Sequence, residues 1–79
     1  MADSVEEHLS ARRWLDAYAE RLGVAPPTRE EFAALLDLAG VAAHASQRVA
    51  APVACWLAAR ADAAPTRALE ISRTVVVDG

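Results

Sequence analysis

The sequence lacks lysine and asparagine entirely, and it contains one cysteine and three glycines. A single cysteine, Cys55, excludes an internal disulfide and a metal site built from paired cysteines. Three glycines are too few for a P-loop or a dinucleotide-binding fingerprint. No apolar run reaches the roughly 18 residues of a membrane span, and the acidic N-terminus lacks the apolar segment of a signal peptide. We therefore expect a protein of the reducing cytoplasm with no membrane partner.

Basic charge is also scarce. The net charge is -3, the sequence pI is about 5.2, and the eight basic residues are all arginines spread along the chain. A nucleic-acid-binding domain usually carries a basic stripe, so we expect no nucleic-acid partner. The absence of lysine together with an excess of alanine indicates the codon bias of a GC-rich genome.

What the chain has in abundance is small apolar side chains. Apolar residues make up 54% of its 79 residues, which is too many for a disordered segment. Twenty of them are alanines, which bury little area. This length predicts one domain over residues 1–79 with a modest core, of limited stability unless a partner adds to it.

Apolar residues recur at intervals of three and four positions, which predicts an all-α fold. Gly23, Pro52 and Pro65 mark the breaks between helices, and Thr28 with Glu31 has the spacing of a capping box. The β-branched run at 74–77 prefers strand geometry, but no partner strand is evident, so we assign it to a frayed helix end. The predicted elements of this small four-helix domain are helices near 4–22, 28–47, 52–62 and 65–76.

The large apolar side chains are expected to form the core. We predict that the helix-spaced residues of the second helix are largely buried, together with the two tryptophans. These residues are Phe32, Leu35, Leu36, Trp14 and Trp56.

Three polar residues interrupt the small apolar surface of the second predicted helix. At 100° per residue, Asp37, His44 and Arg48 lie within about 40° of one another, and we call them the polar stripe. They are a candidate site for an anion or a polar group of a partner. Asp37 and His44 are roughly 10 Å apart along the axis, too far for one metal ion to bridge. The alternative is that the stripe is a solvated helix face, with Arg48 favoured by the helix dipole.

Gly40 lies on the same side of this helix. Glycine costs roughly 1 kcal/mol relative to alanine in a helix interior, so we expect a neighbouring helix or another chain to approach closely there. The candidate binding residues are therefore Asp37, Gly40, His44 and Arg48. Paired catalytic carboxylates and a Ser-His-Asp arrangement are not recognisable, so we expect no enzyme activity, no cofactor and no metal.

One ordered set of residues resembles a known family. The set comprises Trp14, Leu22-Gly23, Leu35-Leu36-Asp37-Leu38-Ala39, Ala43-His44, Arg48, Ala50-Ala51-Pro52-Val53 and Leu57. It is similar to a small helical domain of unknown function from high-GC bacteria. That domain occurs alone or fused behind molybdenum cofactor guanylyltransferase-like enzymes, which attach a guanine nucleotide to molybdopterin. The resemblance implies an accessory role in molybdenum cofactor biosynthesis and assigns no role to any single residue.

Two functional hypotheses follow. The first is a non-catalytic interaction or accessory module, whose protein partner is a molybdenum cofactor biosynthesis enzyme or a second copy in a homodimer. The second is a small-ligand or anion-binding domain that uses His44 and Arg48. A pocket holding both side chains would favour the ligand, and a flat apolar patch would favour the protein partner.

Overall fold

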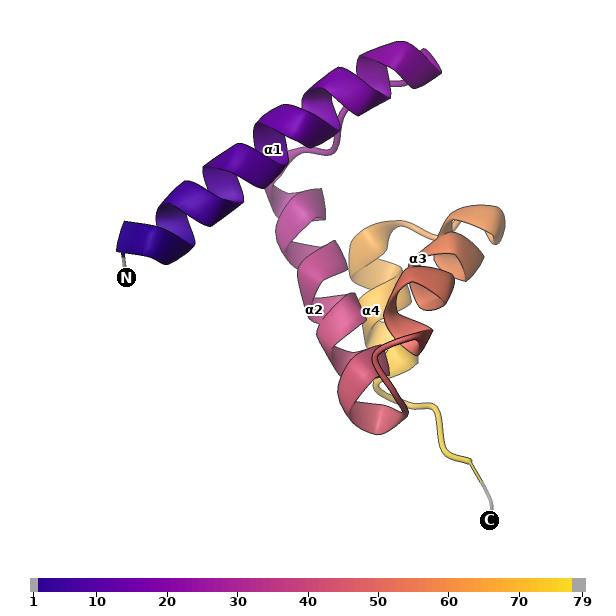
Figure 1. Cartoon of the computed structure of the whole chain (residues 1–79). Helices are drawn as coiled ribbons and strands as arrows, with labels where there is room; N and C mark the ends of the chain where they lie inside the picture. Colours follow the sequence, from indigo (N-terminus) through magenta and orange to yellow (C-terminus); the bar gives the residue numbers. More distant parts are fainter. Residues whose placement is uncertain (1, 78–79) are drawn as a thin grey trace.

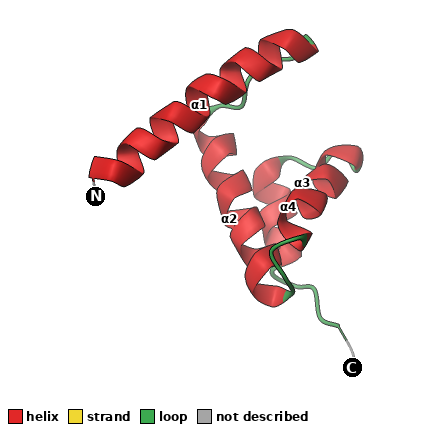
Figure 2. Cartoon of the chain, in the orientation of Figure 1, coloured by secondary structure: helices red, strands yellow, loops and turns green. Residues whose placement is uncertain are grey.

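The fold is all α. The structure is a computed structural model that describes residues 2–77, with side chains from residue 9 onward. No strand occurs within residues 2–77, which confirms the predicted fold class (Figure 2). The helices are α1 (Ala2–Leu22), α2 (Arg29–Ala45), α3 (Ala50–Arg60) and α4 (Pro65–Ser72).

The helices are arranged as a three-helix body with one helix set across it. α2 packs against both α3 and α4, while α1 crosses the N-terminal end of α2 and projects beyond it on both sides (Figure 1). The radius of gyration is 13.5 Å, against about 11.6 Å for a compact chain of this length. The molecule is therefore open, and the projecting α1 is the main reason.

Local interactions end two of the helices. At the end of α1, the amide of Gly23 donates to the carbonyl of Glu20 and that of Val24 donates to Ala19, at 3.1 and 3.0 Å. This is a Schellman motif, and it requires the positive φ of 78° at Gly23. The predicted stop at Gly23 is confirmed. α3 ends in the same way, with Asp62 in the left-handed position at φ 57°.

The capping box of α2 is present as predicted. The amide of Glu31 donates to the Thr28 hydroxyl oxygen at 3.1 Å, and the Thr28 amide donates to a Glu31 carboxylate oxygen at 2.8 Å. Each side chain thus satisfies a backbone donor that the first helical turn leaves unpaired.

The break between α2 and α3 differs from the prediction. α2 ends at Ala45 and not at 47, and α3 begins at Ala50 and not at Pro52. A helical Pro52 would place its ring against the carbonyl four residues earlier, at Arg48. The chain must leave the helix before that position, and Pro52 then fits in the first turn of α3, where no amide donor is needed.

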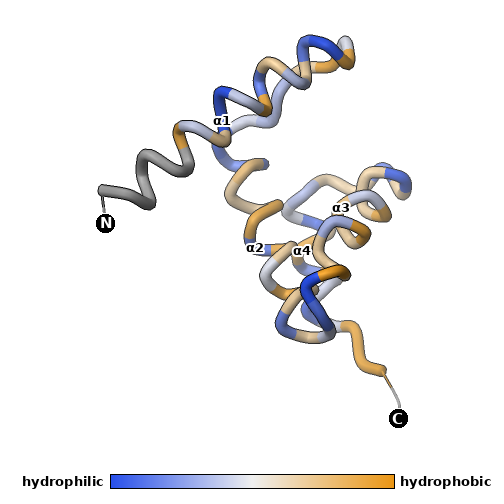
Figure 3. The backbone as a smooth tube through the Cα atoms, in the orientation of Figure 1, coloured by the Kyte–Doolittle hydropathy of each residue, from blue (hydrophilic) through white to orange (hydrophobic). Residues whose placement is uncertain are grey.

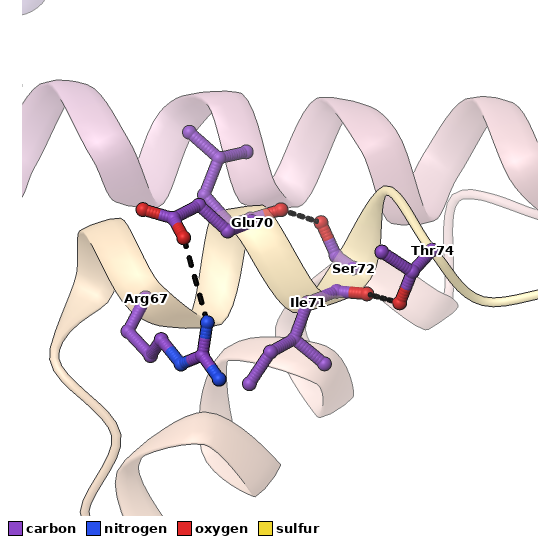
Figure 4. A network of polar contacts seen from close by, with 6 residues as sticks. Arg67, Glu70, Ile71, Ser72 and Thr74 are labelled. Carbon is purple, nitrogen blue, oxygen red and sulfur yellow. Dashed lines mark hydrogen bonds and ion pairs between the residues drawn. The ribbon is translucent and has the colours of Figure 1, made fainter.

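α4 is shorter than predicted, ending at Ser72 and not near 76. The Ser72 hydroxyl donates to the carbonyl of Leu69 at 2.6 Å, and the Thr74 hydroxyl donates to Ile71 at 2.7 Å (Figure 4). These side chains compete for the carbonyls of the last turn. The β-branched residues that follow disfavour a helix, and residues 75–77 continue as an apolar loop (Figure 3).

The core is built mainly from small residues, so the predicted core is largely wrong. The most buried residues are Leu38, at 3% exposure, and three alanines: Ala19, Ala34 and Ala68. Phe32 and Leu35 are only half-buried. Leu36, Trp14 and Trp56 are exposed, at 47%, 63% and 56%. Alanine side chains thus occupy most of the interior, and most of the larger apolar side chains lie on the surface.

Candidate interaction surfaces

The predicted polar stripe is only partly assembled. Asp37, Gly40 and His44 share one side of α2, turned away from Leu38 and from the helices that pack on it. Asp37 and His44 are exposed, and Gly40 is half-buried. Arg48 lies beyond the end of α2, in the turn that leads to α3. The stripe therefore does not continue to Arg48 along one helical face.

The surroundings of Gly40 are open. A Cβ atom at this position would have no atom within 4 Å apart from its chain neighbours and the backbone of its own helix. The expected close approach of a neighbouring helix is therefore wrong for this chain, and an approaching second chain stays a prediction. The side of α2 around Gly40, which we call the α2 outer side (Leu36, Asp37, Gly40, His44), is accessible, because its three side chains are exposed.

The chemistry available on the α2 outer side is limited. Asp37 and His44 remain about 10 Å apart along the helix axis. Among the described residues, no three His, Cys, Asp or Glu side chains lie close enough together to hold a metal ion. Neither His44 nor Arg48 lines the hollows described below. This surface suits contact with another macromolecule better than it suits enclosure of a small ligand.

The thiol of Cys55 is the remaining candidate nucleophile. It is half-buried on α3, and burial raises its pKa above the ordinary value of 9.0 through desolvation. A raised pKa keeps the thiol protonated at neutral pH, and the protonated form is a poor nucleophile. The half-buried, protonated thiol therefore has the character of a small apolar side chain.

α1 carries an aromatic pair on its outer side. The rings of Trp14 and Tyr18 lie 5.0 Å apart between centroids, with an interplanar angle of 30°. Together with Arg21 they border a shallow hollow, and we call these three residues the aromatic ridge. Ala19, on the other side of the helix, is buried, so the ridge points away from the contact with the rest of the chain.

The second apolar surface is a concave one between the last two helices. A hollow of about 300 Å³ has almost exclusively apolar walls. Leu38 lies at its floor, alanines of α3 and α4 line it, and the exposed side chains of Leu57 and Ile71 stand at its rim. We call it the α3–α4 groove (Leu38, Ala54, Leu57, Ala58, Ala68, Ile71). A second hollow of about 380 Å³, toward the end of α2, shares Leu38 and Ala54 with it.

Sequence reasoning missed both surfaces because it assigned the large apolar residues to the interior. One signal was available. Leu15 and Ala19 form one apolar side of α1, while Trp14 and Tyr18 form another. A helix that is apolar on two sides needs two contacts, and residues 9–77 provide a contact only for the side that holds Ala19.

The comparisons with known proteins give one match. Residues 6–77 match the profile of a family described as a domain of unknown function, DUF6457. No curated protein and no solved structure gave a significant match. Among the described residues, no helix is both long enough and apolar enough to span a membrane.

Proposed function

We propose that this chain, which belongs to the DUF6457 family, is a non-catalytic helical interaction module. The observation that carries the proposal is the amount of surface left uncovered. The accessible surface is 6567 Å² for an 8.4 kDa chain, whereas a compact monomer of that mass exposes roughly 4,600 Å².

The chemical character of that surface supports the same function. Alanines fill the interior, while Trp14, Trp56 and Leu57 lie outside. Contiguous exposed apolar surface marks contact sites, and tryptophan, tyrosine and arginine are the residue types that carry most binding energy at interfaces. A chain that places its largest apolar side chains outside gains stability when another protein covers them.

The partner that we propose is a molybdenum cofactor guanylyltransferase. Support comes from the resemblance to a domain of high-GC bacteria that occurs alone or fused behind such enzymes. In this proposal the chain is an accessory subunit, and the α2 outer side receives the enzyme. Gly40 has no side chain to hold the enzyme's backbone away, and Asp37 and His44 flank it as polar contacts.

The test is a titration calorimetry measurement between this chain and the guanylyltransferase of the same organism. Gly40→Leu should weaken binding by tenfold or more, because the new side chain occupies the approach to the helix. Ala59→Leu is the matched control, since Ala59 is exposed on α3 and the same side chain is added there. The Asp37→Ala/His44→Ala double variant should weaken binding to a smaller extent.

Two results would contradict the proposal in different ways. Absence of any heat of binding with the guanylyltransferase would overturn the choice of partner. Binding that survives both Gly40→Leu and the double variant would overturn the choice of the α2 outer side.

A further inference from the structure

We propose that a second copy of this chain covers its two apolar surfaces, with the aromatic ridge of each copy seated in the α3–α4 groove of the other. The inference rests on the proposed function in one respect, that the exposed apolar surface serves protein contact. It adds a specific occupant and a specific geometry, a two-fold symmetric dimer in which α1 completes the helical body of its neighbour.

The two surfaces match in shape and chemistry. Trp14 and Tyr18 project from one side of α1, because they are four residues apart, and both side chains are exposed. The groove is concave, with small side chains in the middle and Leu57 and Ile71 at the rim. Helices pack by inserting the ridge of one into the groove of another, and a groove of alanines has room for two aromatic rings.

The ridge cannot occupy the groove of its own chain in this arrangement. Arg12 donates a hydrogen bond of 2.6 Å from Nη2 to the carbonyl of Pro27, and its guanidinium lies over the ring of Phe32. These contacts hold α1 across the start of α2, with Ala19 facing inward. The connection after α1 is short and contains Pro26-Pro27, which stiffens it. The aromatic pair therefore faces outward, where another molecule can reach it.

The area of uncovered surface favours the reciprocal ridge-in-groove dimer over a dimer held by the two α1 ridges alone. The chain exposes about 2,000 Å² more than a compact monomer of its mass. Obligate dimers bury roughly 1,000–2,500 Å² on each partner, so the excess is what a stable dimer needs. A contact between the two α1 ridges alone would leave both grooves open, whereas the reciprocal contact covers ridge and groove in both copies.

Symmetry supports the same choice. The ridge and the groove are different patches of one chain, so a single contact between them would leave a free ridge and a free groove and could extend into a filament. Two reciprocal contacts use every patch and close the assembly at two copies.

The first measurement is the mass of the full chain by sedimentation equilibrium at micromolar and higher concentrations. The expected mass is twice the 8.4 kDa of one chain. The ridge variant, Trp14→Ala/Tyr18→Ala, should be monomeric while its circular dichroism remains helical, because both side chains are exposed in the single chain. Leu36→Lys is the control, since Leu36 is exposed on α2 but lies on the side opposite Leu38, and it should remain dimeric.

The second measurement tests which patch meets which. The groove variant, Leu57→Lys/Ile71→Lys, should also be monomeric. Mixed with the ridge variant, it should form a heterodimer, because the mixture contains one intact ridge and one intact groove. A contact between two ridges would instead leave the groove variant dimeric by itself, and the mixture would contain no heterodimer.

The proposal is overturned if the wild-type chain is monomeric, if the ridge variant remains dimeric, or if the mixture of two monomeric variants does not associate. Should the groove variant fail to fold, the mass of the ridge variant still decides the question. The guanylyltransferase titration is independent of these outcomes. A monomeric wild-type chain that still binds the enzyme would remove the dimer and leave the proposed function standing.

Discussion

The guanidinium of Arg12 lies over the ring of Phe32, 5.3 Å from the ring centroid. The same guanidinium donates a hydrogen bond to the carbonyl of Pro27. Arg12 belongs to the middle of α1, Phe32 to the first turns of α2, and Pro27 to the connection between them. One side chain thus joins α1 to the body of the molecule, and it sets the direction in which the aromatic ridge points.

Replacing Arg12 with methionine should lower the free energy of unfolding by about 1–2 kcal/mol, because a charged hydrogen bond and a cation–π contact are lost while the apolar stem is kept. Urea denaturation measures the change. Arg13→Met is the neighbouring control, since Arg13 is exposed, and it should stay within about 0.5 kcal/mol of the wild type. Equal losses for the two variants would show that the Arg12 contacts do not hold α1 in place.

The helix boundaries that sequence predicted well are those set by neighbouring residues. The Thr28–Glu31 capping box and the Gly23 stop depend on hydrogen bonds between positions three to five apart, so the motif itself determines them. The end of α2 before Arg48 depended on a less direct effect, the ring of Pro52 acting four residues upstream. The end of α4 depended on the hydroxyl groups of Ser72 and Thr74, which compete with backbone amides for the carbonyls of the last turn. The periodicity of apolar residues carries no information about such hydrogen bonds.

The core was predicted poorly for a different reason. Apolar periodicity shows that a helix has an apolar side, but not which of two apolar sides faces the rest of the chain. In α2 the two leucines Leu36 and Leu38 look equivalent in sequence, and the structure buries only Leu38. The choice depends on where the alanines of α3 and α4 permit close packing, and that is a property of the whole fold.

Leu38→Ala should therefore be the most damaging core substitution. It removes the most buried leucine, and leucine-to-alanine changes in a core cost about 2–5 kcal/mol, which is a large share of the stability of so small a domain. Leu36→Ala is the matched control and should cost far less, because Leu36 is about half exposed. Thermal melting followed by circular dichroism compares the two. A similar drop in Tm for both variants would place Leu36 in a buried contact.

The candidate residues of α2 show the same limit of sequence reasoning. Helical geometry placed Asp37, Gly40 and His44 on one side of α2, and the structure has them there. Their positions are the same whether this side of α2 binds a partner or is only solvated, so sequence does not distinguish the two roles. Gly40 is the informative member, because glycine has a conformational cost in a helix and none of the described residues packs against this position to offset it.

Alanine substitutions at Gly40 and Gly23 should change the free energy of unfolding in opposite directions. Gly40→Ala should raise the free energy of unfolding by about 0.5–1 kcal/mol, because alanine is the better helix former and the added Cβ meets nothing within 4 Å. Gly23→Ala should lower it by about 1–2 kcal/mol, because φ at this position is +78°. Both changes are measured by urea denaturation. A destabilising Gly40→Ala would mean that another chain already packs against α2 in solution.

Cys55 predicts a dependence of stability on alkaline pH. Burial raises the pKa of its thiol in the folded chain above the ordinary value of 9.0. Near neutral pH the thiol is protonated in both the folded and the unfolded chain, so it contributes no pH dependence there. As the pH rises past 9.0, the unfolded chain loses the proton first, which favours unfolding. The free energy of unfolding should therefore fall between the ordinary pKa and the raised one.

Comparison with Cys55→Ala isolates this effect from the ionisation of tyrosine, which both proteins share. The difference in free energy of unfolding between wild type and variant should be constant near neutral pH and should decline as the pH passes through 9.0. Alkylation with iodoacetamide gives a second readout, because only the thiolate reacts. The midpoint of its rate against pH should be higher for the folded chain than for the chain in urea. A constant stability difference and coincident midpoints would together mean that the thiol is as well solvated in the folded chain as in the unfolded one.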